Sequence, residues 1–185
     1  MSSTQSVQPE QLQLNVSINA WHLTISPSGS FLLRSKLKRG TDLPNEHHVV
    51  RHVPLGKTRR DAEGNILGIL PAAIERREDE KYLSVNYLEY FSGTNKQQMA
   101  EVKAAVIAAK QSKSIGTKGL FATANVGALK SVVQAKTTKK IRIAYAPTKN
   151  NLSHSAVHDI PEEDIELMDQ LADEVFLKTV EVSKV

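Results

Sequence analysis

The chain has 185 residues, of which 40% are apolar and 24% are charged. That length and balance are typical of one globular domain that buries a core without added cross-links. It contains no cysteine, which excludes disulfides, thiolate catalysis and zinc or iron–sulfur sites built on cysteine.

No apolar run approaches the length of about 18 residues that a membrane-spanning helix requires. The apolar stretch at residues 12–33 is broken by polar residues, and no basic residue precedes it. A secretory signal is therefore not expected, and the cytoplasm is the expected compartment.

The first 37 residues predict a tail followed by β-structure. Residues 1–10 are rich in Ser and Gln and are expected to form a flexible tail ahead of a single domain over residues 11–185. Apolar side chains then alternate with polar ones over residues 12–18 and 21–25, which predicts strands. Residues 31–37 are expected to return as a hairpin partner.

A second β region is expected in the middle of the chain. Apolar residues 49–55 are predicted to pair with residues 66–70 across a Gly-containing turn at residues 61–65, as in a hairpin. Residues 71–80 indicate a helical turn. Residues 83–91 fit either a strand or a short capped helix.

The next segments predict helices. Thr94 and Gln97 have the spacing of a capping box, and apolar residues recur at helical spacing over residues 95–112, so a helix is expected there. A second helix is expected around residues 126–133. Residues 141–146 predict a short strand, and residues 147–158 a polar loop.

Near the C-terminus, Asp159 and Glu162 are expected to open a helix whose apolar face continues to Ala172. Residues 175–182 either extend that helix or form a last strand. Strands ahead of helices indicate an α+β fold, with α/β as the alternative. We expect six residues in the core: Val102, Val106, Ile141, Ile143, Ile165 and Leu171.

The charge distribution is the main functional feature. Residues 92–149 hold eleven Lys or Arg and one acidic residue, Glu101, for a net charge of +10. Residues 152–185 hold nine acidic residues and two lysines, for a net charge of −7. Such asymmetry indicates an anionic partner or internal charge pairing.

A row of lysines is the first candidate anion-binding surface. Lys96, Lys103 and Lys110 are seven residues apart and point the same way from a helix. The alternative is an ordinary solvated face. Further basic residues extend the candidate surface: Lys113, Lys118, Lys130, Lys136, Lys139, Lys140 and Arg142.

A second basic cluster comprises Arg51, Lys57, Arg59 and Arg60. Arginine forks suit phosphate or carboxylate groups. The alternative, which we favour at this stage, is charge pairing at the end of the hairpin, because its turn carries acidic residues at positions 61 and 63.

Candidate catalytic residues are few. His52, His154 and His158 are possible acid–base groups, and Glu89, an acid in an apolar run, would join Arg51 and His52 if the fold brought them together. Two histidine pairs have a spacing of four residues, His48 with His52 and His154 with His158. Neither pair has a third ligand at suitable spacing, so no metal is expected, and no cofactor is indicated. Residues 116–119, Gly-Thr-Lys-Gly, resemble a phosphate loop only loosely.

No motif specifies a reaction. The sequence therefore favours a non-enzymatic module that holds nucleic acid or an acidic protein on a basic face. One alternative is an enzyme acting on a phosphorylated or nucleotide substrate. Its site would use Arg51, His52, Lys57, Arg59 and Glu89, with His154 or His158 as a further member. A third is a subunit of a larger complex or of a homo-oligomer, joined by its opposite charge blocks.

Overall fold

The structure is a computed structural model that describes residues 37–77, 79–111 and 114–185. The expected tail, the strands at residues 12–18 and 21–25, and most of the hairpin partner at residues 31–37 lie outside the described residues. A single domain beginning at residue 11 therefore stays a prediction.

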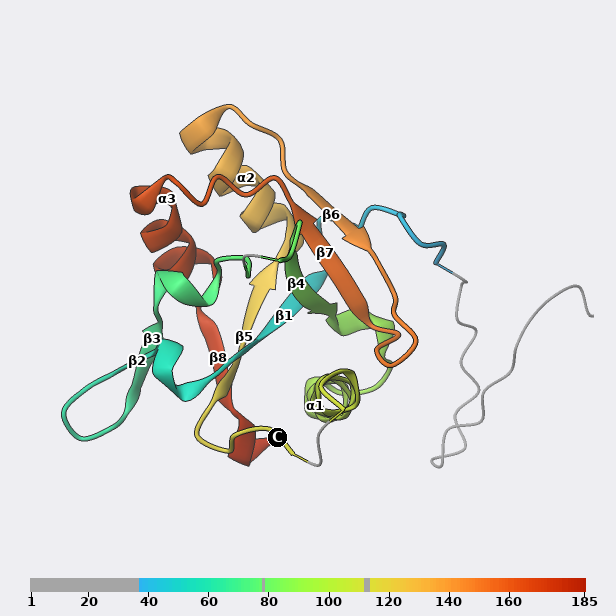
Figure 1. Cartoon of the computed structure of the whole chain (residues 1–185), viewed down its shortest axis with the longest axis vertical. Helices are drawn as coiled ribbons and strands as arrows, with labels where there is room; N and C mark the ends of the chain where they lie inside the picture. The colour runs from blue at the N-terminus through green and yellow to red at the C-terminus, as the bar shows by residue number, and fades with distance from the viewer. Residues whose placement is uncertain (1–36, 78, 112–113) are drawn as a thin grey trace, which may run out of the picture. The chain divides into compact units, whose positions relative to one another are not determined.

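The described chain is built on an antiparallel sheet of six strands (Figure 1). Its spatial order is β6-β7-β4-β1-β5-β8, and every neighbouring pair is antiparallel. The strands are β1 (His48–Val53), β4 (Leu83–Tyr87), β5 (Leu120–Asn125), β6 (Arg142–Tyr145), β7 (His154–His158) and β8 (Lys178–Glu181). A separate hairpin pairs β2 (Thr58–Arg60) with β3 (Ile66–Ile69).

Three α-helices of the described residues cover the sheet. Helix α1 (Asn95–Ala109) packs on one face, and α2 (Val126–Thr137) and α3 (Ile165–Gln170) pack together on the other (Figure 1). Four short 3-10 helices, Leu55–Lys57, Pro71–Ala73, Leu88–Tyr90 and Val182–Lys184, and a π-helical turn at Leu171–Val175 complete the described elements. The fold is α+β, as predicted.

Strand β1 shows why the sheet is buried on both faces. The side chain of Val49 joins the core under α2 and α3, and that of Val50 joins the core under α1. Both are fully buried. A strand covered on both sides has consecutive apolar residues rather than strict alternation. None of the described helices is both long and apolar enough to cross a membrane.

The expected capping box is confirmed at the start of α1. The Gln97 amide donates to the Thr94 hydroxyl at 3.4 Å, and the Thr94 amide donates to the Gln97 side chain at 2.8 Å. These bonds satisfy two of the free amides of the first turn. Met99, Val102 and Val106 then face the sheet.

Strands β1 and β4 separate part-way along their length. They pair only at Val49 with Tyr87 and at Val50 with Asn86, although β1 stays paired with β5 from His48 to Val53. Beyond Val50, the edge of β1 therefore has no ladder to β4. This opening positions the candidate site described below.

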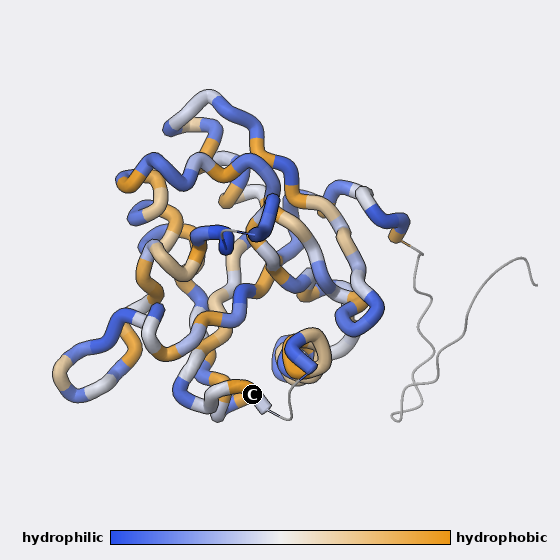
Figure 2. The backbone as a smooth tube through the Cα atoms, viewed as in Figure 1, coloured by the Kyte–Doolittle hydropathy of each residue, from blue (hydrophilic) through white to orange (hydrophobic). Residues whose placement is uncertain are grey.

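The middle β region differs from the expected hairpin. The turn at residues 61–65 is present and largely hydrophilic (Figure 2), and Gly64 has the left-handed φ of +86° that such a turn favours. Its strands, however, are β2 and β3; pairing residues 49–55 with residues 66–70 was wrong. Pro54 ends β1 and a 3-10 turn follows, so β1 pairs with β4 and β5 instead.

Residues 83–91 contain both expected structures in succession, the strand β4 and the 3-10 helix Leu88–Tyr90. The helix at residues 95–112, the helix around residues 126–133 and the strand at residues 141–146 are confirmed as α1, α2 and β6. Residues 71–80 contain a short 3-10 turn, and residues 175–182 contain the strand β8.

Two further strands of the described chain, β5 and β7, were not predicted. Strand β5 pairs with both β1 and β8 although it contains two alanines, which have weak strand propensity. The prediction of a polar loop over residues 147–158 was wrong, because β7 occupies His154–His158 between β4 and β6. The polar ends of β7 hid its buried centre at Ala156 and Val157.

Helix α3 begins later than predicted. Asp164 is its N-cap, and its carboxylate accepts from the Leu167 amide at 3.0 Å. Asp159 instead has a left-handed φ of +64°. The late start turns Ile165 outward, with 74% of it exposed, so its assignment to the core was wrong. The other five expected core residues are buried: Val102, Val106, Ile141, Ile143 and Leu171.

Candidate functional site

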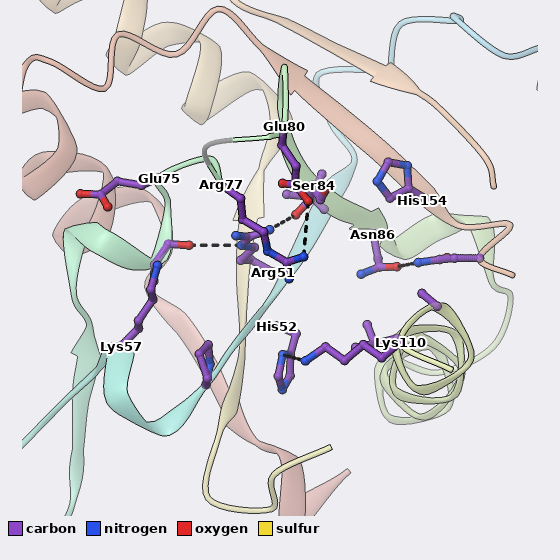
Figure 3. A pocket seen from close by; sticks show the side chains of 16 residues that line it. Arg51, His52, Lys57, Glu75, Arg77, Glu80, Ser84, Asn86, Lys110 and His154 are labelled. Carbon is purple, nitrogen blue, oxygen red and sulfur yellow. Dashed lines mark hydrogen bonds and ion pairs between the residues drawn. The ribbon is translucent and has the colours of Figure 1, made fainter. Parts of the chain in front are cut away.

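The opening between β1 and β4 leads into a cavity of about 310 Å³ (Figure 3). Its wall is formed by β1, the segment from Pro71 to β4, the C-terminal end of α1, and the chain around Asn151 and His154. We call it the β1–β4 cavity. Its polar lining comprises Arg51, His52, Lys57, Glu75, Arg77, Glu80, Ser84, Asn86, Lys110, Asn151 and His154.

Arg51 bridges the opening. Its Nη1 donates to the Ser84 carbonyl on β4 at 2.5 Å, and its Nε donates to the Ala73 carbonyl at 3.2 Å (Figure 3). Burial lowers the pKa of Arg51, and repulsion by Arg77 adds to this, although Glu80 opposes it. A guanidinium has five N–H donors, so Arg51 keeps donors beyond those that hold it in place.

His52 points to the opposite face of β1 and meets α1. Its Nδ1 lies 3.4 Å from the Lys110 amine. Because an ammonium group only donates, Nδ1 accepts and the hydrogen of the neutral ring is on Nε2. Burial lowers the pKa of His52 to about 4, with repulsion by Lys110 and Arg51 as further causes, so the ring is neutral near pH 7.

Lys110, the C-cap residue of α1, faces His52. Burial lowers its pKa, and repulsion by Arg77 and Arg51 adds to this. No carboxylate within ion-pair distance neutralises Lys110 in the described chain. Among the described residues, four cationic side chains thus line the cavity against two carboxylates, those of Glu75 and Glu80.

A polar network forms the side of the cavity near β7. The Asn86 carbonyl oxygen accepts from Asn151 at 2.7 Å and from the Ser153 hydroxyl at 3.2 Å. Its amide nitrogen therefore points the other way, toward the side of the cavity where Arg51 lies (Figure 3). Asn86 adds a neutral donor to the cationic ones.

Two acceptors face the same cavity. His154 donates from Nδ1 to the Ala146 carbonyl at 2.7 Å, and burial lowers its pKa, so its Nε2 is a free acceptor in the neutral ring. Glu80 approaches Arg77 at 3.7 Å through Oε1. Its buried Oε2 has no hydrogen-bond partner.

The structure divides the second basic cluster. Arg51 and Lys57 line the cavity, where Lys57 donates to the Ala72 carbonyl at 2.6 Å. Arg59 instead pairs with Asp173, and Arg60 donates to the backbone of Gly64 and Lys118. None of the described ion pairs joins this cluster to the acids of the turn, so the favoured charge pairing was wrong. Asp61 instead accepts from Asn65.

Glu89 does not meet Arg51 and His52. Its carboxylate accepts from the His48 amide at 2.9 Å and lies 2.7 Å from His48 Nδ1, and it does not line the cavity. His158 packs against the Tyr82 ring at 5.4 Å and also lies outside the lining. Of the candidate catalytic residues, the cavity brings together His52 and His154.

The basic residues of segment 92–149 do not share one surface. Lys96, Lys103 and Lys110 are on or just after α1, and Lys130 and Lys136 are on α2, across the sheet. Lys139, Lys140 and Arg142 follow α2, Lys118 precedes β5, and Lys113 lies outside the described residues.

The members of the α1 row also differ. Lys96 is exposed, Lys103 donates to the carbonyls of Val182 and Val185, and Lys110 faces the cavity. The acidic segment pairs elsewhere, with Lys136 through Glu166 at 2.9 Å and with Lys139 through Glu163 at 3.4 Å. Arg142 pairs with Asp42, and Lys130 donates to Asn45.

Arg77, Glu80 and Asn86 were missed by sequence reasoning. Arg77 and Glu80 belong to a charged stretch with no spacing that singles them out, and their role follows from the separation of β1 from β4. Asn86 did carry a signal, since it is an amide between apolar residues of a strand.

In the described chain, no three His, Asp or Glu side chains are grouped closely enough to hold a metal ion.

Comparison of the chain with models of protein families, with curated proteins and with solved structures finds no match in any of the three. The geometry of the cavity is therefore the basis for assigning a function.

Proposed function

We propose that the β1–β4 cavity binds a small phosphorylated organic molecule. The observation that carries the proposal is a surplus of positive charge around the partly buried guanidinium of Arg51. Lys57, Arg77 and Lys110 belong to the same lining, and two carboxylates of the described residues oppose these four cations. No described carboxylate lies within ion-pair distance of Arg51. An unpaired charge away from water is costly, and a bound anion relieves that cost. Arginine and lysine together are the usual ligands of phosphate in proteins.

The remainder of the lining supports an organic ligand rather than free phosphate. The side chains of Val85 and Val106 provide apolar surface. Glu80 Oε2 and His154 Nε2 can accept from hydroxyl groups, and the Asn86 amide can donate. A cavity of about 310 Å³ lies at the lower end of the range for small-molecule sites, roughly 300–1,000 Å³.

Binding of a phosphorylated molecule in the cavity replaces binding of nucleic acid or an acidic protein on a basic face as the favoured function. The basic residues of segment 92–149 lie on both sides of the sheet, and those near α3 are paired with acids. The cavity instead gathers four residues named for the phosphorylated-substrate alternative, Arg51, His52, Lys57 and His154.

Lys110→Gln tests the proposal, with Lys96→Gln as the matched control. Both lysines belong to the same row, and only Lys110 lines the cavity. We expect calorimetric titration with inorganic phosphate, at constant ionic strength, to show about tenfold weaker binding for Lys110→Gln, because a charge-assisted hydrogen bond is lost. Lys96→Gln should bind phosphate like the unmodified protein.

Two results would overturn the proposal. One is the absence of phosphate binding. The other is an equal loss of binding in Lys96→Gln and Lys110→Gln, together with salt-sensitive binding of DNA or RNA. That result would show that anions bind to a general basic surface and not in the cavity.

A further inference from the structure

A second hollow of about 390 Å³ adjoins the β1–β4 cavity. His52, Pro54 and Lys110 line both of them. The remainder of the second hollow is lined by Leu55 and the turn at residues 116–119, and no described carboxylate belongs to its lining. His52 and Lys110 therefore form a wall between two hollows that are both positively charged.

The turn at residues 116–119 is fixed in place from several sides. The Gly119 amide donates to the Gly116 carbonyl at 3.1 Å, and the Gly119 carbonyl accepts from Val182 at 3.0 Å. Arg60 donates to the Lys118 carbonyl at 2.9 Å. A Cβ at Gly119 would lie 2.8 Å from the Val53 carbonyl, so only glycine permits this close approach to the end of β1.

Lys118 is the cation that this turn contributes. It is exposed and lines the second hollow, and none of the described ion pairs includes it. The turn therefore places an uncompensated ammonium group on the far side of the wall from Arg51 and Arg77.

His52 has one polar atom for each side of this wall. Its Nδ1 accepts from Lys110. Its Nε2 lies on the side of Gly119, 3.5 Å from where a Cβ of that residue would be, and is buried without a hydrogen-bond partner. The imidazole ring thus packs against the turn while its Nε2–H donor has no acceptor. A buried donor without a partner is uncommon in a folded protein.

We propose that the ligand of the cavity is bisphosphorylated, with one phosphate held in the β1–β4 cavity by Arg51 and Arg77 and the second held in the adjoining hollow by Lys118. Lys110, which lines both hollows, contacts both groups. The inference rests on the proposed function and names the substrate class of that site. A monophosphate would leave the second hollow and Lys118 without use.

A series of diphosphonates tests the inference. Methane-, ethane-, propane- and butane-diphosphonate present two anionic groups at increasing separation, and methylphosphonate is the single-group reference. We expect at least one diphosphonate to bind about tenfold or more tightly than methylphosphonate, because the second contact becomes intramolecular. Titration calorimetry at constant ionic strength measures both.

Lys118→Gln locates the second contact. We expect this variant to lose the advantage of the best diphosphonate while binding methylphosphonate unchanged, and we expect Lys118→Arg to restore it. Lys96→Gln, another exposed lysine, is the control and should keep the full advantage.

The outcomes separate the two proposals. If methylphosphonate binds but no diphosphonate binds more tightly, or if Lys118→Gln keeps the advantage, the second hollow is not a subsite and the proposed function stands. If neither compound nor inorganic phosphate binds, the proposed function fails, and the inference fails with it.

Discussion

His52 links the cavity to the pH dependence of stability. Its pKa in the folded chain is lowered to about 4 from an ordinary value of 6.5. As the pH falls below 6.5, the unfolded chain takes up a proton at this residue and the folded chain does not. The free energy of unfolding therefore decreases between about pH 6.5 and pH 4 and is insensitive to His52 above that range.

We expect His52→Gln to remove this part of the pH dependence. The ring is only partly buried, so solvent screening limits the effect to on the order of 1 kcal/mol. Urea unfolding of both proteins at pH 7.5, 6 and 5, without phosphate, measures it, and the unmodified protein should lose more stability toward pH 5. Parallel curves for the two proteins would show that His52 titrates normally in the folded chain.

Individual residues of the cavity were only partly predictable. Arg51, His52, Lys57 and His154 were all candidates because of their chemistry. Which candidates meet depends on where β4 leaves β1, and no local pattern encodes that point. Glu89 is an example of this limit. An acid in an apolar run is unusual, and the sequence singled it out for that reason. Its partner is His48, however, and the strand pairing that brings the two together has no local signature in the sequence.

At the scale of elements, α3 offers a direct test of where a helix begins. The Asp164 carboxylate accepts from the Leu167 amide, whereas Asp159 lies ahead of the helix with a left-handed φ of +64°. We expect Asp164→Ala to reduce the free energy of unfolding by about 0.5–2 kcal/mol, the usual cost of losing an N-cap.

Asp159→Gly is the matched substitution in the same segment. Glycine adopts a left-handed φ without strain, so we expect this variant to unfold at nearly the same denaturant concentration as the unmodified protein. Chemical denaturation of both variants measures the difference. A larger loss for Asp159→Gly than for Asp164→Ala would restore Asp159 as the residue that opens the helix.

Elements with strong local patterns were predictable and the others were not. Helix α1 has both a capping box and a regular apolar face, and it was placed within three residues at its C-terminal end. Strands β5 and β7 take their stability from neighbours on both sides, so alanines and polar ends are tolerated there. Tertiary context decides such strands more than propensity does.

At the scale of the whole described chain, the cavity lies where three parts meet. Helix α1 contributes Lys110, β1 contributes Arg51 and His52, and the chain from Pro71 to β4 contributes Arg77 and Glu80. Burial, and after it the repulsion between these cationic groups, lowers the pKa of Arg51 and of Lys110. An anion bound among them converts that repulsion into attraction toward a shared centre.

We therefore expect phosphate to stabilise the three parts together. At a free concentration about 100 times the Kd, binding should raise the free energy of unfolding by about 2.7 kcal/mol.

Hydrogen exchange followed by mass spectrometry should show slower exchange in three peptides, those covering the end of α1, β1, and residues 71–84. The β2–β3 turn, which lies outside the lining, is the internal reference and should exchange at an unchanged rate. Lys110→Gln should reduce the protection in all three peptides together at the same phosphate concentration, because about tenfold weaker binding lowers the stabilisation to about 1.4 kcal/mol. Protection confined to α1 would contradict this, since it would show that phosphate binds to the helix surface and not between the parts.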